Sequence, residues 1–524
     1  MNPPSLYDLS LRQTVEILRV GIWRRFEENP LELIPKSVYD DLVKLTFSLP
    51  IYARPRAHDI FFLLSSGQPK QLDLYKFNTR TNFVPRFKEI FDDEYLANLN
   101  AEEKHFQRVG LVDCMSLIRM MIGRMWPSVR SLSTPIHLQY NEAASRILID
   151  RCPNLEDLHT EVLFSADFLK TCRNLRSLRF HLNSEQVLEH YKNNIVGIGS
   201  LRDLEVFSMC LSSANCFEIF PVVAHLLFRC PKLTSVGLLD TSLAIMQLLN
   251  CAPNPPARFA LRSCFWGICH RFHVEDAKEE YPAIYKTRFP ELIETSVAMC
   301  PLVEKLVMEV VHIDSLKFLP YLNNLTFLNL NFKFCDSLCV PEIITLLSKV
   351  GHKLKYLLIE KPLEDFRLKF PVNVICKHCD NLETFGVFGY SVVKGKLVDY
   401  PSLKKLKKLS ILNSDEDSLY YMLKNCVNLE ELSLFFAFYL DDYLLGKILA
   451  SNSLSKLKLL QIYQCNLSRT GVEALIRSAV NLEKISFNSM DGLASSVVKD
   501  LNRDIKYFDA TVEYFPCMVD ACHF

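Results

Sequence analysis

The sequence predicts an α/β fold in which a strand and a helical stretch repeat along most of the chain to form a solenoid. Two observations lead to this prediction. Apolar residues with the spacing Leu-x-x-Leu-x-Leu recur about every 20 to 29 residues, and several copies are followed by apolar residues at helical spacing. A period in this range is the signature of stacked repeats, so it outranks the other signals in the chain.

The apolar spacing predicts a strand in each repeat. Residues three and five positions after the first apolar residue share one face of an extended segment, because the side chains of a strand alternate between faces. The clearest copies are Leu155/Leu158, Leu175/Leu178/Phe180, Leu204/Phe207/Met209, Leu233/Val236/Leu238, Val303/Leu306/Met308, Leu325/Leu328/Leu330, Leu354/Leu357/Ile359, Leu382/Phe385/Val387, Leu406/Leu409/Ile411, Leu429/Leu432/Leu434, Leu457/Leu460/Ile462 and Leu482/Ile485/Phe487. Weaker copies are Leu72/Leu74 and Val129/Leu132 before this array, Phe259/Leu261 within it and Ile505/Phe508 after it.

The stretch after the strand predicts a helix, as the spacing of Val222, Leu226 and Leu227 illustrates. A strand and a helix cannot bury their apolar faces alone, so neighbouring repeats must stack into one continuous core. We therefore expect a leucine-rich-repeat solenoid of the horseshoe form, with parallel strands on its concave side.

Composition agrees with a solenoid and excludes some partners. The chain has 524 residues, of which 49% are hydrophobic, whereas a single globular core stops growing near roughly 250 to 300 residues. Its 60 basic and 60 acidic residues give a formal net charge of zero. Nucleic-acid binding normally needs a basic excess, so we expect no nucleic-acid partner.

The chain carries no evident targeting or membrane segment. Its first residues lack a basic segment ahead of an apolar run, which a secretory signal would have. No uninterrupted apolar stretch approaches the roughly 20 residues of a membrane span. We expect a cytoplasmic or nuclear protein with no membrane partner, whose 18 cysteines are reduced.

Several cysteines have a structural position in the repeats. They stand three residues before the first apolar position, as in Cys-Pro-Asn-Leu, and behave as small buried hydrophobes at a corner; they are Cys152, Cys172, Cys230, Cys300, Cys379 and Cys426. The pair Cys376 and Cys379 has the spacing of a redox couple or half a zinc site, but no second pair lies at a zinc-like spacing. Without a phosphate loop, nucleophile elbow or zinc-protease motif, we expect no enzyme, no cofactor and no metal site.

The first 50 residues are separate from the repeats and predict two amphipathic helices. Ser5 and Asp8 have the spacing of a capping pair, and the helix they open has an apolar stripe at Leu11, Val15, Leu18 and Ile22 beside a second one begun by Leu6 and Leu9. Pro35 suits the first turn of the second helix, whose apolar face we expect at Val38, Leu42, Leu45 and Leu49.

We divide the chain accordingly. Residues 1–50 form a helical adaptor-binding box or a cap, 51–128 divergent first repeats and helices, and 129–510 the solenoid. An insertion loop is expected near 269–290, where the repeat pattern fails, and 511–524 form a tail.

These features resemble known families. The cysteine corners, over roughly residues 125 to 510, are similar to the cysteine-containing leucine-rich repeats of F-box and related ubiquitin-ligase receptors. The N-terminal helices resemble a von Hippel-Lindau box, in which a small residue and Leu open the first helix and a Cys follows. Here Ser5-Leu6 match that opening, but Ser10 stands where Cys is usual. The box also has an aliphatic residue further along the helix, and Val15 lies one position after the place where it is usual. The second part of that box, aliphatic-Pro-x-x-aliphatic-x-x-x-aliphatic, fits Ile34 to Leu42 throughout.

The resemblance implies partners. With leucine-rich repeats behind the box, the chain looks like the zyg-11 and PRAME-like substrate receptors of cullin-RING ubiquitin ligases, although the armadillo repeats of zyg-11 relatives have no counterpart here. Elongin C would then bind Leu6, Leu9 and Ser10. Cullin-2 would contact Ile34, Pro35, Val38 and Leu42.

Three alternatives remain open for these helices. Leu33 to Leu42 also resembles the opening of an F-box, which would bind a Skp adaptor and cullin-1. An F-box needs about forty residues with further helices; Pro55 interrupts the next segment, and Asp59 to Leu64 could resume a helix. The helices could instead be only the cap that a solenoid needs, which would leave a protein-interaction scaffold without a ligase. A signalling sensor would use the same repeats but normally carries a nucleotide-binding domain or a secretion signal.

The residue after the last core position of each strand should lie on the open face, because side chains alternate. In the earlier repeats these residues are mostly polar, namely Glu161, His181, Cys210, Glu309, Asn331 and Glu360. Later repeats have an apolar row, Phe388, Leu412, Phe435 and Tyr463, which predicts a binding site for a protein substrate. Alternatively, the tail with Tyr514, Phe515 and Phe524 covers this row. The lysines at 404, 405, 407 and 408 read as a solvated rim rather than a phosphate site.

Overall fold

The fold is taken from a computed structural model of the chain. It describes residues 6–25, 31, 34–49, 54–67, 69–74, 116–134, 142–160, 168, 171–182, 202–211, 220–267, 283–332, 339–361, 369–395, 403–412, 414–487, 491–501 and 505–507. The chain forms two compact units. The N-terminal unit consists mainly of Asn2–Ser235, and the C-terminal unit consists mainly of Val236–Cys269 and Val274–Phe524.

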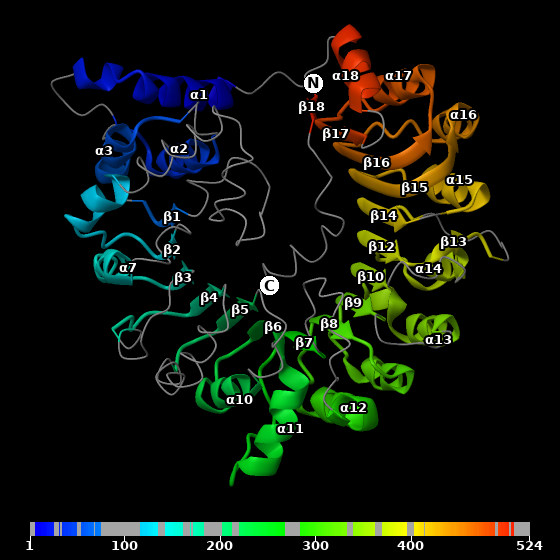
Figure 1. The fold of residues 1–524 in the computed structure, drawn as a ribbon, viewed down its shortest axis with the longest axis horizontal. Coiled ribbons are helices and arrows are strands. Elements are labelled where there is room, and N and C mark those ends of the chain that lie inside the picture. Colours follow the sequence, from blue (N-terminus) through cyan, green and yellow to red (C-terminus); the bar gives the residue numbers. More distant parts are fainter. Residues whose placement is uncertain are drawn as a thin grey trace, which may run out of the picture. The chain divides into compact units, whose positions relative to one another are not determined.

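Each unit contains parallel strands that follow one another in chain order (Figure 1). In the N-terminal unit these are β1 (Gln71–Asp73), β2 (Ser131–Ser133), β3 (Asp157–Thr160), β4 (Ser177–Leu182) and β5 (Val206–Leu211). In the C-terminal unit they are β6 (Ser235–Asp240), β7 (Ser263–Trp266), β8 (Lys305–Glu309), β9 (Phe327–Asn331), β10 (Tyr356–Glu360), β12 (Thr384–Phe388), β14 (Lys408–Leu412), β15 (Glu431–Asp441), β16 (Leu459–Asn466), β17 (Lys484–Phe487) and β18 (Lys506–Tyr507). The short strands β11 (Lys369–Pro371) and β13 (Ser391–Val393) pair separately.

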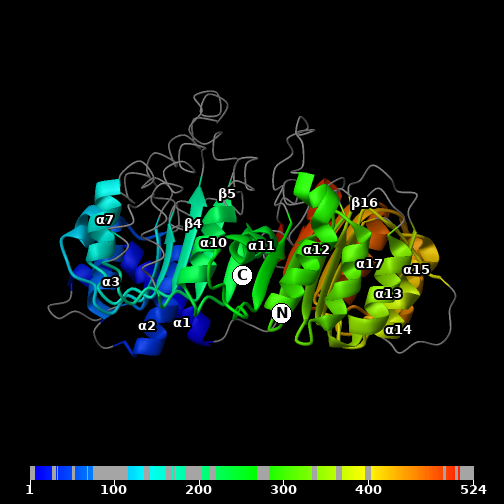
Figure 2. The ribbon, with the colours of Figure 1, turned by 90° about the horizontal axis from the view of Figure 1, so that it is seen from below.

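The first three α-helices and η1 precede β1, whereas the later helices connect successive strands and lie on one side of them in each unit (Figure 2). In the N-terminal unit they are α1 (Leu6–Arg19), η1 (Ile22–Arg25), α2 (Lys36–Ser48), α3 (Ala57–Gly67), α7 (Glu142–Asp150) and α10 (Phe220–Arg229). In the C-terminal unit they are α11 (Thr241–Cys251), α12 (Ala283–Met299), η8 (Ile313–Tyr321), α13 (Val340–Val350), η9 (Gly351–Lys353), α14 (Val372–His378), α15 (Glu416–Asn425), α16 (Asp442–Ser451), α17 (Arg469–Ser478) and α18 (Asp491–Asp500).

This α/β architecture of in-order parallel strands confirms the predicted repeat units. Their register is constant, because the second apolar residue of one repeat pairs with that of the next. In the C-terminal unit this column runs Leu306, Leu328, Leu357, Phe385, Leu409, Leu432, Leu460 and Ile485. All of these side chains are almost completely buried, so the column forms the core between strands and helices. The horseshoe form stays a prediction.

Cysteine ends the preceding helix at several corners. Cys426 follows α15, donates its N–H to Met422 and accepts from the N–H of Leu429, where the next repeat begins. Cys379 is bonded in the same way, and Cys152 donates to Ile149, one residue nearer, and accepts from Leu155. All three side chains are buried, as expected for a small apolar residue that must fit between a helix end and a strand. Cys172 is the one predicted corner cysteine that is only half-buried.

Two boundaries differ from the sequence prediction. The predicted insertion at 269–290 overlaps α12, so 283–290 are helical; its earlier part lies outside the described residues. The helix accommodates Pro290 through a kink, because Arg288 leaves the helical conformation with φ of −127°. In the weak repeat at Phe259/Leu261 the strand begins later, at Ser263. The predicted cap Ser5 and the tail 511–524 lie outside the described residues.

Candidate functional site

The first turn of α1 presents apolar side chains to solvent. Leu6 is 82% exposed and Leu9 is 49% exposed, and Ser10 is also exposed. On the opposite face of the helix Leu11, Val15 and Leu18 of the predicted stripe are buried, whereas its fourth member, Ile22, lies beyond the helix end and is 39% exposed. Helix α1 therefore rests on α2 and α3 through one face and keeps the beginning of another face free.

Polar contacts hold α1 in place at both ends. At its beginning, the hydroxyl of Tyr7 donates to Asp41 Oδ2 on α2 at 2.7 Å. After its end, Trp23 Nε1 and Arg24 Nη2 donate to Oδ1 of the buried Asp59 on α3, at 2.9 and 2.6 Å. The ring of Trp23 also stacks on Phe62, with centroids 3.6 Å apart. These contacts fix the position of the exposed Leu6 and Leu9.

The buried face of helix α2 differs from the apolar face predicted at Val38, Leu42, Leu45 and Leu49. Its buried face consists of Tyr39, Leu42, Val43, Thr46 and Phe47, at the spacing of one side of a helix. Leu42 is fully buried, so the predicted cullin contact at this residue is wrong. The other predicted residues are accessible: Pro35 is exposed, and Ile34 and Val38 are half-buried. Because α2 also contacts β1, the three helices close the first edge of the N-terminal repeats.

The predicted apolar row on the open face is buried. Phe388, Leu412 and Phe435 are at most 3% exposed, and Leu358 joins their cluster. The rings of Phe388 and Phe435 have centroids 5.9 Å apart, and Tyr463, which is half-buried, lies against Phe435 at 6.5 Å. The prediction that this row is a solvated substrate-binding surface is therefore wrong for its three buried members, because neighbouring large side chains pack as a second apolar layer.

The polar part of the same row is partly buried as well. Glu309 and Glu360 are buried, whereas Asn331 is half-buried. Burial raises the pKa of Glu360 to about 7, because a carboxylate loses its hydration there. Glu161 and the side chains of His181 and Cys210 lie outside the described residues.

A second row of polar residues lies at the opposite, N-terminal ends of the strands, one residue after the first apolar position of each repeat. Its charged members alternate in sign: Arg130, Glu156, Arg176 and Glu205 in the N-terminal unit, and Arg262, Glu304, Lys355, Glu383, Lys407, Glu430, Lys458 and Glu483 in the C-terminal unit. Thr234 and Thr326 occupy the same position in two repeats and carry no charge. The carbonyl of each accepts the N–H of the next, as Lys407 does from Glu430 at 2.7 Å. We call this row the charge ladder.

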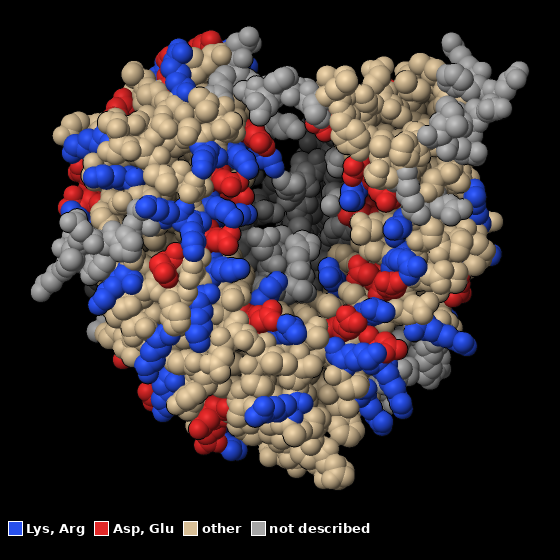
Figure 3. Space-filling model, turned by 180° about the vertical axis from the view of Figure 1, so that it is seen from behind, with Lys and Arg blue, Asp and Glu red and all other residues tan. Residues whose placement is uncertain are grey.

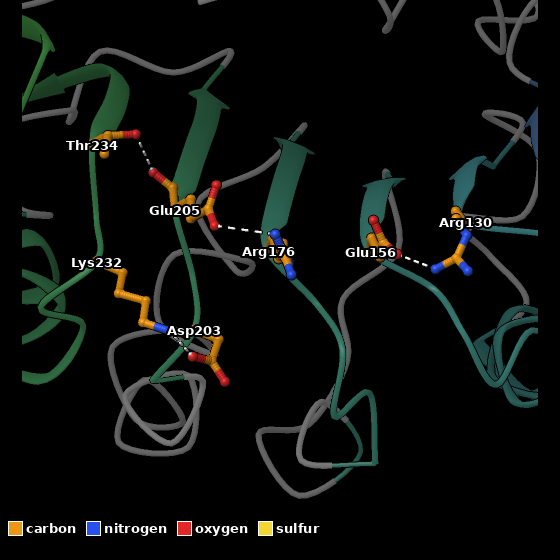
Figure 4. A network of polar contacts seen from close by, with 7 residues as sticks. All are labelled: Arg130, Glu156, Arg176, Asp203, Glu205, Lys232 and Thr234. Carbon is orange, nitrogen blue, oxygen red and sulfur yellow. Dashed lines mark hydrogen bonds and ion pairs between the residues drawn. The ribbon is translucent and has the colours of Figure 1, made fainter.

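In the N-terminal unit the charge ladder borders a hollow of about 460 Å³. Figure 4 shows its ion pairs: Arg130 with Glu156, Arg176 with Glu205 at 3.6 Å, and Lys232 with Asp203 at 2.6 Å. Arg173 also lines it and has no ion-pair partner within the part of the chain that the structure describes. The charges in this hollow are therefore largely neutralised by one another.

In the C-terminal unit the ladder borders a second hollow, of about 400 Å³, which is lined by as many cations as the first but by one carboxylate fewer. We call it the lysine hollow; it is lined by Glu383, Lys404, Lys405, Lys407, Asn428, Glu430 and Lys456. It lies at the N-terminal ends of the strands, the face seen in Figure 3, where Lys and Arg gather with interspersed acidic side chains over the repeats of this unit. The predicted solvated rim is thus part of a concave surface.

No feature of the described residues indicates metal or redox chemistry. Burial raises the pKa of Cys376 to about 11 and that of Cys379 to about 12, so both thiols are protonated at neutral pH. Among the described residues no group of His, Cys, Asp and Glu is arranged to hold a metal ion. No helix in this part of the chain has both the length and the apolar character needed to span a membrane.

Some exposed groups were not predicted. Tyr7, between Leu6 and Leu9, is 43% exposed and donates the hydrogen bond to Asp41. Its position within the N-terminal motif was the feature of the sequence that could have identified it. At the end of β15 and the start of α16, Phe438, Tyr439 and Tyr443 are more than half exposed. The length of β15, 11 residues, exceeds that of the other strands, and the period-two pattern does not reveal this extension.

No protein-family model matches the chain, and no curated protein matches it. Among solved structures, the chain is similar to one described as the crystal structure of the Rad7 and Elc1 complex in yeast, with 13% sequence identity over 92% of this chain and 93% of that chain. The TM-score is 0.28. A score this low leaves the fold to be judged from the strands and helices themselves.

Proposed function

We propose that this chain is the substrate-recognition subunit of a cullin-RING ubiquitin ligase, in which α1 binds elongin C and the repeats bind a protein substrate. In this proposal the chain supplies binding rather than a catalytic step, and it works in the cytoplasm or nucleus without a cofactor. The observation that carries it is the exposure of Leu6 and Leu9 at the beginning of a helix whose other face is packed.

An exposed leucine at a fixed helix end suits adaptor binding. Burying an apolar side chain in a partner contributes about 1.5 to 3 kcal/mol, and a helix already held by its neighbours loses little conformational entropy on binding. Leu6 is the most exposed large apolar side chain of the described residues, so it has the most to gain. Ile34, Pro35 and Val38 supply accessible groups for cullin-2, whereas the buried Leu42 does not.

One observation favours a second candidate, an F-box-type receptor that binds a Skp adaptor and cullin-1. Helix α3 begins at Ala57, directly after the segment that Pro55 interrupts. It supplies the later helix that an F-box requires. A helix in this position also suits a plain cap, so the adaptor itself must be identified by binding.

Co-purification of the full chain with elongin B/C, and separately with a Skp adaptor, tests the proposal. We expect elongin capture by the wild type and its loss in Leu6→Asp, because truncation of such an anchor costs about 2 kcal/mol or more, which is roughly thirtyfold in affinity. Val20→Asp is the matched control, since Val20 is 55% exposed just beyond the other end of α1.

The melting temperature separates binding from stability. If Leu6→Asp loses elongin while its melting temperature equals that of Val20→Asp, the adaptor role stands. Capture of the Skp adaptor instead moves the chain to the F-box class. Capture of neither adaptor leaves a repeat scaffold whose N-terminal helices serve as a cap.

A further inference from the structure

The lysine hollow has an excess of cations that its own carboxylates do not neutralise. Lys407 pairs with Glu383 at 2.7 Å, and Glu430 is occupied by Lys458 at 2.6 Å. Lys405 donates only to the amide oxygen of Asn381, at 2.5 Å, and Lys456 only to that of Asn428. Lys404 is exposed, and none of these last three lysines has a carboxylate partner among the described residues.

The corresponding hollow of the N-terminal unit shows that this excess is not a general property of the repeats. There, three of the four cations pair with carboxylates, and only Arg173 is left over. The difference comes from Lys404 and Lys405, which stand side by side at the corner before β14, and from Lys456, which meets the amide of Asn428 where Lys232 meets the carboxylate of Asp203. Asn381 and Asn428, on the flanking repeats, hold the neighbouring lysines in place.

We propose that the lysine hollow binds an acidic segment of a protein partner, through oxyanions that reach Lys404, Lys405 and Lys456. The relevant groups are carboxylates of Asp or Glu, or phosphate on Ser or Thr, which share the chemistry that ammonium groups recognise. The proposal rests on the proposed receptor role in one respect, namely that the acidic segment belongs to a substrate of the receptor. It does not depend on which adaptor binds α1.

The arrangement of charges favours a peptide over a nucleic acid. Lys404 and Lys405 belong to the repeat of β14 and Lys456 to that of β16, two strands away, which corresponds to about 10 Å at the usual strand spacing. An extended peptide places residues three apart at about this distance. Glu430, in the repeat of β15, lies between the two lysine sites, and Glu383, in the repeat of β12, borders Lys404 and Lys405 on the other side. These carboxylates repel the continuous row of phosphates of a nucleic acid but tolerate anions separated by neutral residues.

The local field agrees with this assignment. The pKa of Glu383 is lowered, first by the hydrogen bond from Lys407 and further by the charges of Lys355 and Lys405. The pKa of Glu430 is lowered in the same way by Lys458 and by Lys407 and Lys408. Each carboxylate of the hollow is thus held in its charged form by more than one lysine, and an incoming oxyanion meets the same positive surroundings.

Fluorescence anisotropy with labelled peptides tests the proposal on the full chain. The probes are extended peptides with Glu, phosphoserine or Ser at every third position, and a single-stranded oligonucleotide of equal charge. We expect the Glu or phosphoserine peptide to bind at least tenfold more tightly than the Ser peptide, and more weakly as salt rises from about 50 to about 300 mM because exposed charges are screened. The better of the two acidic probes identifies the source of the anion.

The double variant Lys404→Glu with Lys405→Glu should lose at least tenfold in affinity for that peptide. Lys349→Glu with Lys424→Glu is the matched control, because it changes the net charge equally on exposed helix positions of the same unit. Equal losses in both double variants, no preference for acidic peptides, or tighter binding of the oligonucleotide would each overturn the inference. Elongin capture is unaffected by these substitutions, so failure here leaves the adaptor proposal intact.

Discussion

At the residue scale, Glu360 is a buried group whose ionisation should matter for stability. Its pKa rises from 4.5 in the unfolded chain to about 7 in the folded one, because its side chain is buried. The folded state therefore holds a proton that the unfolded state releases, and stability falls as pH rises from about 4.5 to about 7. The loss is about 3 kcal/mol, at about 1.4 kcal/mol per pKa unit.

Glu360→Gln should remove this dependence, since the amide mimics the protonated acid. We expect the variant to be more stable than the wild type at about pH 8 and to approach it at about pH 5. Urea denaturation at both pH values measures the difference in the free energy of unfolding. Parallel behaviour of the two proteins across this range would show that Glu360 is ionised in the folded state.

Gly389, directly after β12, is a position at which the backbone requires glycine. Its φ is +75°, and a Cβ added there would lie 2.0 Å from the carbonyl oxygen of Lys361. Gly389→Ala should therefore cost more than about 2 kcal/mol, since strain and a backbone clash add. Gly446→Ala is the contrast, because its Cβ would meet nothing within 4 Å in α16, and it should stabilise by about 0.5 to 1 kcal/mol. Equal melting temperatures for these variants would contradict this reasoning.

At the scale of the elements, Asp59 joins the segment after α1 to α3 through Trp23 and Arg24. Asp59→Ala leaves both donors without their acceptor and should destabilise the protein by about 1.5 to 3 kcal/mol, as expected for hydrogen bonds to a charged group. Asp41→Ala, which removes the exposed bond to Tyr7, should cost less than about 1 kcal/mol. The midpoints of urea denaturation compare the two, and a larger loss in Asp41→Ala would show that the helices are held differently.

The sequence predicted strands better than it predicted surfaces. Copies such as Leu406, Leu409 and Ile411 identify β14 because side-chain alternation is a local rule. The same rule assigned Phe388 and Phe435 to the open face, but it cannot tell whether other side chains cover that face. In α2 the spacing placed Leu42 on the apolar face, and Leu42 is buried, but the rest of the buried side differs from the prediction and includes Tyr39 and Phe47. Tyr39 and Phe47 pack according to where α1 and α3 lie against α2, and the spacing of residues within α2 carries no information about that.

At the scale of the whole molecule, each unit adds its core one strand and one helix at a time, so stability and binding can be assigned to different rows of the same repeats. The chain's 60 basic and 60 acidic residues give no net charge, whereas the lysine hollow is lined by four lysines and two glutamates and is locally positive. In the N-terminal unit, α2 covers the first strand while α1 leaves Leu6 exposed. One group of helices can thus close the repeats and bind an adaptor.

The most direct test of this account is a calorimetric titration of the purified full chain with purified elongin B/C. We expect binding with a Kd of about 1 μM or tighter, which corresponds to about 8 kcal/mol or more, and a loss of roughly thirtyfold in Leu6→Asp but not in Val20→Asp. The absence of measurable heat at these concentrations, or an equal loss in both variants, would contradict the claim that the exposed end of α1 is an adaptor site.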